Sequence, residues 1–163
     1  MTPVRELARK DHCSRTPSVT RFAADIVPNP VAIAGLTGDV AAFLRDAGVD
    51  ARAVHHVALV IEEILTNVAT HGGSPDAQAT VALEVQRDRI SGEIGDRGKP
   101  FDPRSGPDPD IAAPLEERRI GGLGLHLVRK LTSVLDYRSD GKQNRTAFSI
   151  PREQERGLSH GPQ

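Results

Sequence analysis

Three polar side chains recur at intervals of four residues in the stretch EEILTNVATHGG, residues 62–73: Glu63, Asn67 and His71. On a helix, residues four apart lie above one another, so these three would form a stripe along one side. A carboxylate and a carboxamide one turn apart offer oxygen atoms to a hard cation, and the carboxylate can also accept a proton from a hydroxyl group. On this stripe alone, a surface edge with a hydrogen-bonded Asn and a helix-end His is the commoner explanation.

A second candidate site residue is Asp96 in the stretch GDRGKPFD, residues 95–102. It stands where an expected strand ends, and strand ends in α/β sheets often face ligands. A carboxylate there can accept a hydrogen bond from an exocyclic amine such as that of adenine, and Gly98 permits a close backbone approach. An ordinary Asp-x-Gly turn explains the same residues, and taken alone it is the commoner case.

A third stretch, GGLGLHL at residues 121–127, places Gly121, Gly122 and Gly124 at the start of an expected helix. The first N–H groups of a helix have no internal partner and can bind phosphate. The stretch is not a dinucleotide fingerprint, because Leu127 stands where the third glycine belongs and a loop precedes it. The chain also contains no P-loop motif. Glycines that end a flexible loop are the alternative.

The apolar pattern predicts the elements that hold these residues. A helix opened by Asn29 and Pro30 spans residues 29–49, and a second, capped by Asp50, runs to His71. On the second helix, Glu63 falls at the margin of an apolar face made of Val57, Val60, Ile61, Ile64, Leu65 and Val68.

Period-two alternation predicts strands at residues 20–27, 79–87 and 89–96, the last two joined by a tight hairpin at Asp88. The stretch at residues 99–120 is rich in Pro and Asp and has no period, which is typical of a functional lid or of disorder. A helix follows in residues 121–135, and a hairpin of residues 136–140 and 145–150 turns at Gly141. Grouped helices and strands predict an α/β (α+β) two-layer sandwich.

Composition fits one domain of 163 residues, with 37% hydrophobic residues and a net charge of −1. We expect a domain at 20–151 between flexible tails at 1–19 and 152–163. The near-neutral charge gives no field that favours nucleic acid or an anionic membrane. A single cysteine, Cys13, rules out an internal disulfide framework. The chain has no membrane-spanning apolar run and its first residues do not read as a signal peptide, so we expect a cytoplasmic protein.

Taken together and in this order, the three stretches resemble the ATP-binding domain of the GHKL superfamily, which includes gyrase, Hsp90, histidine kinases and MutL proteins. EEILTNVATHGG resembles its N box, DRGKPFDP its first glycine box and GGLGLHLVRKL its second. The resemblance covers about residues 20–150. It implies a Bergerat-type fold with a mixed, mostly antiparallel sheet, and a lid at residues 102–120.

Within that superfamily the chain is most similar to the anti-sigma-factor serine kinases of bacterial partner switching, which carry a T-N-x-x-x-H N box. The resemblance implies that Glu63 is the general base and that Asn67 coordinates Mg²⁺. The implied ATP-binding residues are Asn67, His71, Asp96, Gly98, Gly121, Gly122, Leu123, Gly124, Leu125 and Thr146. Among them, Asp96 would hold the adenine amine, Gly122 and Gly124 would lie by the phosphates, and Thr146 would support the adenine site.

The same resemblance implies a serine/threonine protein kinase that phosphorylates a STAS-domain antagonist, sequesters a sigma factor or similar regulator, and forms a homodimer. One departure is the first glycine box, D-R-G-K-P-F, which lacks the second glycine of the fuller D-x-G-x-G form. Two alternatives stay open: an ATP-binding module that sequesters a partner without kinase activity, and a histidine-kinase-like catalytic domain. The intact Glu63 favours the kinase over the pure binder.

Overall fold

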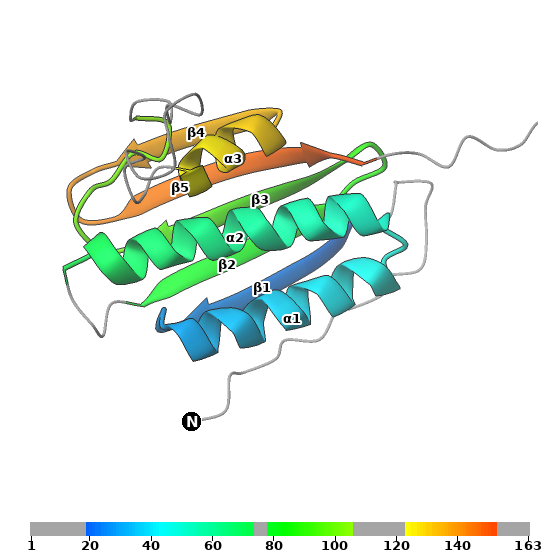
Figure 1. Ribbon diagram of the computed structural model, residues 1–163, viewed down its shortest axis with the longest axis horizontal. Helices are drawn as coiled ribbons and strands as arrows, with labels where there is room; N and C mark the ends of the chain where they lie inside the picture. The colour runs from blue at the N-terminus through cyan, green and yellow to red at the C-terminus, as the bar shows by residue number, and fades with distance from the viewer. Residues whose placement is uncertain (1–18, 74–77, 106–122, 153–163) are drawn as a thin grey trace, which may run out of the picture.

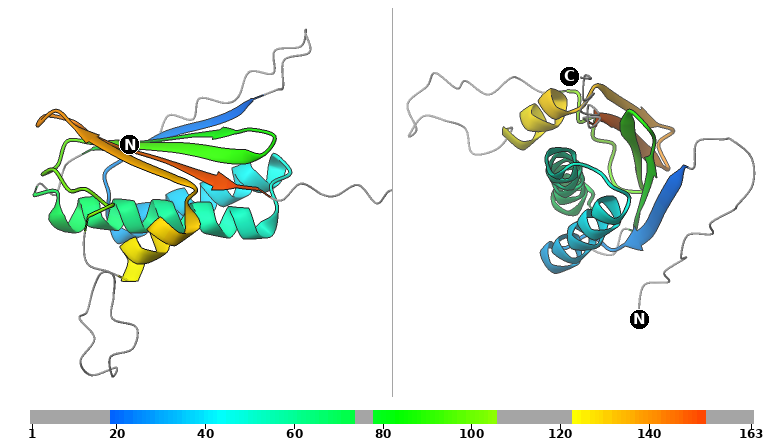
Figure 2. Two further views of the ribbon diagram at one scale, coloured as in Figure 1. Left: turned by 90° about the horizontal axis from the view of Figure 1, so that it is seen from above. Right: turned by 90° about the vertical axis from the view of Figure 1, so that its right-hand side faces the viewer.

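One five-stranded sheet and three helices make up the parts of the chain that the computed structural model describes, residues 19–73, 78–105 and 123–152. The helices all lie on the same face of the sheet, so the molecule has two layers (Figure 1). Figure 2 shows this most plainly in its right-hand view, where the sheet is seen beside the helices. The predicted two-layer α/β sandwich is therefore confirmed.

The helices are α1 (Pro30–Asp46), α2 (Ala51–His71) and α3 (Leu123–Leu131). The strands are β1 (Thr20–Ile26), β2 (Ala79–Val85), β3 (Arg89–Asp96), β4 (Val134–Ser139) and β5 (Asn144–Pro151). Their order in the sheet is β1-β2-β3-β5-β4, and each of the four neighbouring pairs is antiparallel. We expected a mixed, mostly antiparallel sheet. All pairings among the described strands are antiparallel.

Side-chain caps begin both long helices where the sequence predicts. The Ala32 N–H donates to Asn29 Oδ1 at 3.0 Å at the start of α1, and the Ala53 N–H donates to Asp50 Oδ1 at 2.8 Å at the start of α2. After α1, Gly48 takes a φ of +70°, a left-handed conformation that glycine adopts without strain. The caps thus fix the length of α2 and with it the place of its polar stripe.

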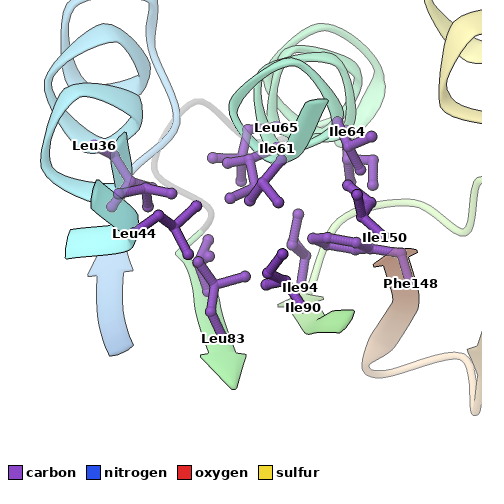
Figure 3. Packing of buried hydrophobic residues seen from close by; sticks show 14 of the residues in the cluster. Leu36, Leu44, Ile61, Ile64, Leu65, Leu83, Ile90, Ile94, Phe148 and Ile150 are labelled. Carbon is purple, nitrogen blue, oxygen red and sulfur yellow. The ribbon is translucent and has the colours of Figure 1, made fainter. Parts of the chain in front are cut away.

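The core lies between the helices and the inner face of the sheet (Figure 3). Each predicted apolar position of α2 is buried except Val68, which is half-buried. Across from them lie Leu83, Ile90, Ile94, Phe148 and Ile150, all nearly inaccessible to solvent. This packing anchors α2, so the residues at the margin of its apolar face are held at a set distance from the strands.

The strand order brings one end of α2 together with the site residues of the sheet. Asp96 ends β3 and pairs with Asn144, which begins β5. On the next strand, Tyr137 of β4 pairs with Thr146 of β5. At this end of the sheet the turn after β3 touches the end of α2, because the Lys99 N–H donates to the Gly72 carbonyl at 3.0 Å.

The last helix is shorter than the predicted helix of residues 121–135. It ends at Leu131, and Val134 and Leu135 instead begin β4. The Ser133 N–H donates to the Ser149 carbonyl at 2.8 Å, so the chain is already bonded to β5 where we expected it to be helical. Pairing with a neighbouring strand overrides helix propensity here, a tertiary effect that periodicity does not reveal.

Several predictions fall on residues 1–18, 74–77, 106–122 and 153–163, outside the described residues. They concern Cys13, Gly121, Gly122, most of both tails and most of the lid. Within the described ranges, no helix combines the length and the apolar character needed to cross a membrane.

Candidate functional site

A pocket open to solvent lies where the end of α2 meets β3 and β5. It has an empty volume of about 350 Å³, open solvent included, and Ile64 and Val68 form part of its apolar lining. Three predicted site residues from three separate elements line it: Asn67, Asp96 and Thr146. The fold therefore gathers residues that are 79 positions apart in the chain, from 67 to 146, around one cavity.

Asp96 is a buried carboxylate with one oxygen that accepts hydrogen bonds from the protein and one that does not. Its side chain is 8% exposed. Oδ1 accepts hydrogen bonds from the Gly98 N–H at 2.8 Å and from Asn144 Nδ2 at 2.9 Å. Oδ2 has no partner among the described residues, and Asp96 lines the pocket. The site can thus accept one hydrogen bond from a donor such as an amino group.

Asn144 and Tyr137 support Asp96, and sequence reasoning missed both. Asn144 is 2% exposed and also donates to the Gly98 carbonyl at 3.0 Å. The Tyr137 hydroxyl donates to Asn144 Oδ1 at 3.0 Å and accepts from the Phe101 N–H at 3.0 Å. The available signal was position, because Asn144 stands two residues before Thr146 and so shares its face of the strand. The predicted strand began at residue 145, which left Asn144 in the turn.

Gly98 is required by a close approach between two backbones. A Cβ there would lie 2.7 Å from Gly72 Cα and 3.1 Å from Asp96 Oδ1. A side chain would therefore force the turn after β3 away from the end of α2. We expected Gly98 to permit the approach of an adenine base, and its contact with Gly72 is a separate structural reason for the same glycine.

Asn67 presents an oxygen that suits a hard cation. Its Nδ2 donates to the Glu63 carbonyl one turn earlier in α2, at 2.8 Å. That bond orients the amide and leaves Oδ1 without a partner among the described residues. Carboxamide oxygen is a ligand that Mg²⁺ accepts, so this donor fits the ion. The described ranges hold no cluster of three or more His, Cys, Asp or Glu, so the described residues do not form a metal site by themselves.

Glu63 is half-buried on α2 and lies against the first turn of α3. Burial raises the pKa of its carboxyl above the ordinary value of 4.5, and the charge of the neighbouring Glu62 raises that pKa further. A Cβ on Gly124 would overlap Glu63 Cδ and Oε2, so only glycine leaves room for this carboxylate. Glu63 itself does not line the pocket but stands one helical turn from Asn67, toward α3.

His71 and the residues around Gly124 occupy the edges of this arrangement. The exposed His71 ring stacks on the Phe101 ring, with centroids 5.8 Å apart and planes at 27°, and Phe101 lines the pocket. Leu123 is 56% exposed and Leu125 is half-buried, both on α3. The structure thus joins Glu63 to Gly124, and places Asn67, Asp96 and Thr146 around one pocket.

This fold and this site belong to a known class of domain. A family model described as a histidine kinase-like ATPase domain matches residues 26–150, so the chain belongs to that family. The expected GHKL membership is therefore confirmed.

Individual relatives agree with this assignment. The chain is 33% identical over 109 residues to the serine/threonine-protein kinase BtrW of Bordetella bronchiseptica, an alignment that covers 65% of this chain and 76% of BtrW. It is 32% identical over 92 residues to the serine-protein kinase RsbW of Listeria monocytogenes, covering 52% of this chain and 58% of RsbW. The chain thus spans little more than half of the length of the Listeria relative.

A solved structure shares the fold. The crystal structure of the RsbU and RsbW domains of a Mycobacterium tuberculosis protein superposes with a TM-score of 0.57 at 14% identity, over 82% of this chain and 33% of that one. At this identity the likeness concerns the fold alone.

Proposed function

We propose that the chain is an ATP-binding serine/threonine protein kinase of the anti-sigma-factor type. The observation that carries this proposal is the pairing of two oxygens around one pocket: Asp96 Oδ2 on the sheet and Asn67 Oδ1 on α2. The first suits the amino group of adenine and the second suits Mg²⁺ on the phosphates. Relatives that are named serine or serine/threonine kinases support the same activity.

In this proposal, Asp96 and Thr146 would bind the base, and Asn67 would hold the metal. Mg²⁺, when bound, would neutralise charge on the phosphates. His71, Gly98 and the stretch Gly121–Leu125 complete the ATP site, as the resemblance implies. The remaining catalytic contribution of the chain is positioning, which accounts for most of the catalysis of phosphoryl transfer.

Glu63 is the proposed general base. The serine oxygen of the substrate forms a bond to the γ-phosphorus, the bond from that phosphorus to the bridging β,γ-oxygen breaks, and the hydroxyl proton passes to the Glu63 carboxylate. The raised pKa makes Glu63 a stronger base than a solvated glutamate. Gly124 leaves the carboxylate its space at the start of α3.

The proposed substrate is a STAS-domain antagonist protein, and the proposed sequestered partner is a sigma factor or a similar regulator. We further propose a homodimer that acts in the cytoplasm. These assignments rest on the resemblance of the N box and glycine boxes to the anti-sigma-factor kinases. The near-neutral net charge of −1 agrees with protein partners rather than nucleic acid or membrane.

The test is a transfer assay with γ-labelled ATP, Mg²⁺ and the cognate antagonist. We expect label on one serine of the antagonist, and none when the antagonist carries alanine at that serine. Bound ATP without label on the folded antagonist would show a sequestering module and reject the kinase. Label on a histidine of a partner would show a histidine-kinase-like domain.

A further inference from the structure

Beneath the pocket, a chain of hydrogen bonds runs in one direction from the turn after β3 to Asp96. The Phe101 N–H donates to the Tyr137 hydroxyl, that hydroxyl donates to Asn144 Oδ1, and Asn144 Nδ2 donates to Asp96 Oδ1. The three distances are 3.0, 3.0 and 2.9 Å. This series of hydrogen bonds crosses from β4 through β5 to β3, so it depends on the strand order of the sheet.

The direction of every bond in this chain is set by the chemistry at its ends. A backbone N–H can only donate and a carboxylate can only accept, so Tyr137 must accept from Phe101 and donate its single proton to Asn144. Turning the Asn144 amide over would aim its oxygen at the Asp96 carboxylate and the Gly98 carbonyl, which are both acceptors. Asn144 is 2% exposed, so water does not offset such a mismatch.

The bonds of Asn144 decide what Asp96 offers to the pocket. Together with the Gly98 N–H, Asn144 occupies Oδ1 and leaves Oδ2 without a partner in the described part of the chain. Two donors on one oxygen also fix the orientation of the carboxylate. The pocket therefore presents a fixed acceptor at this point. A fixed acceptor binds a 6-amino purine and repels the oxygen of a 6-oxo purine.

We propose that Asn144, oriented by Tyr137, is the positioning residue that makes this pocket select a 6-amino purine over a 6-oxo purine. The inference rests on the proposed function, since it takes Asp96 as the acceptor for the base. The inference concerns only the ratio of the affinities for a 6-amino and a 6-oxo purine nucleotide. Whether a nucleotide binds at all is a question for the proposed function.

The experiment compares the dissociation constants of ATP and inosine 5′-triphosphate, which has an oxygen in place of the 6-amino group, by calorimetry in Mg²⁺. The wild-type chain should prefer ATP. In Asn144→Ala, we expect ATP to bind on the order of tenfold more weakly while inosine triphosphate changes by less than about twofold, because Asp96 loses one of its two donors. A merely structural role would weaken both nucleotides together.

The matched control is Arg145→Ala, the next residue of β5, whose exposed side chain points to the other face of the sheet and pairs with Glu93 at 3.5 Å. It should leave the affinity ratio at the wild-type value. Thermal melts of each variant show whether it is folded before the ratio is interpreted.

Tyr137→Phe tests the same claim even if Asn144→Ala does not fold. Removing the hydroxyl takes away the donor that orients the Asn144 amide, so the ratio should fall by a smaller factor, about threefold. An unchanged ratio in folded Asn144→Ala, or in Tyr137→Phe if the first variant is unfolded, overturns the inference, as does a wild-type chain that binds both nucleotides equally. A wild-type chain that binds neither nucleotide defeats the proposed function itself.

Discussion

The two ends of the candidate site treat their carboxylates in opposite ways. Asp96 is more deeply buried than Glu63, yet one of its carboxylate oxygens accepts two hydrogen bonds. Glu63 is half-buried and its carboxylate has no hydrogen-bond partner among the described residues, so burial raises its pKa and the charge of Glu62 raises it further. A carboxylate held in place by hydrogen bonds is suited to binding a donor, and a carboxylate whose pKa is raised by burial is suited to accepting a proton. The comparison predicts that substitutions at the two ends change different quantities.

The largest expected effect is loss of phosphotransfer in Glu63→Gln. The amide keeps the shape of the side chain but cannot accept the serine proton, so the rate should fall by roughly 10²–10⁴-fold. ATP affinity should stay within about twofold of wild type, because Glu63 does not line the pocket. Transfer at the wild-type rate would remove Glu63 from the mechanism.

The wild-type rate should also fall as the pH drops through the raised pKa of Glu63, which lies above 4.5. The carboxylate is protonated below that point and cannot act as a base.

The next effect in size is expected for Gly124→Ala. The added methyl group would overlap the Glu63 carboxylate and displace it, and a displacement of about 1 Å can lower a rate on the order of 10²-fold. Gly35→Ala is the matched control, because that glycine is also helical but has nothing within 4 Å of an added Cβ. Equal transfer rates for both variants would show that Glu63 does not need its present position.

Asp96→Asn should change binding rather than the rate of transfer. The new amide oxygen can accept the two bonds now made to Oδ1, which turns the amide nitrogen toward the pocket. A donor would then face the amino group of adenine, so ATP should bind roughly 10–100-fold more weakly. Inosine triphosphate should bind more tightly than it does to the wild-type chain. Calorimetry with both nucleotides measures this, and an unchanged preference would contradict the role of Asp96.

Free energies of unfolding should move in opposite directions at the two ends. Asp96→Ala removes an acceptor from two donors and should destabilise the fold by about 1–3 kcal/mol.

Glu63→Gln should instead stabilise the fold at neutral pH. Because the folded pKa of Glu63 is raised, ionising it costs stability above that pKa, and the cost disappears as the pH falls below the unfolded value near 4.5. Denaturant melts at neutral and acidic pH measure both variants. If both Asp96→Ala and Glu63→Gln lowered the free energy of unfolding at neutral pH, the predicted difference between the two carboxylates would be wrong.

The smallest effect is expected for His71→Ala. It removes a ring stack on Phe101 at 5.8 Å, an interaction of about 0.5–1.5 kcal/mol when well formed and less at an exposed site. ATP affinity should fall by about two- to threefold. A loss of more than roughly tenfold would contradict this small contribution of His71 to ATP binding.

The sequence predicted the local features well, because caps and periodicity are local. Asn29 and Asp50 cap their helices, and Glu63 lies at the margin of the apolar face, as the spacing indicated. The pairing of residues far apart in the sequence could not be predicted from these local patterns. Val134 joins β4 because β5 lies beside it, and Asn144 meets Asp96 because β5 inserts between β3 and β4. Val134 carries no signal of this pairing in its own neighbourhood, and Asn144 carries only its spacing of two residues from Thr146.

The central claim is that one Mg·ATP binds where α2 meets β3 and β5, with Asn67 on the metal. Calorimetric titration of the folded chain with ATP and with ADP, in Mg²⁺ and in EDTA, tests it most directly. We predict one nucleotide per chain, bound more tightly with Mg²⁺, and loss of that metal dependence in Asn67→Ala. No heat with either nucleotide from the folded wild-type chain would contradict the account.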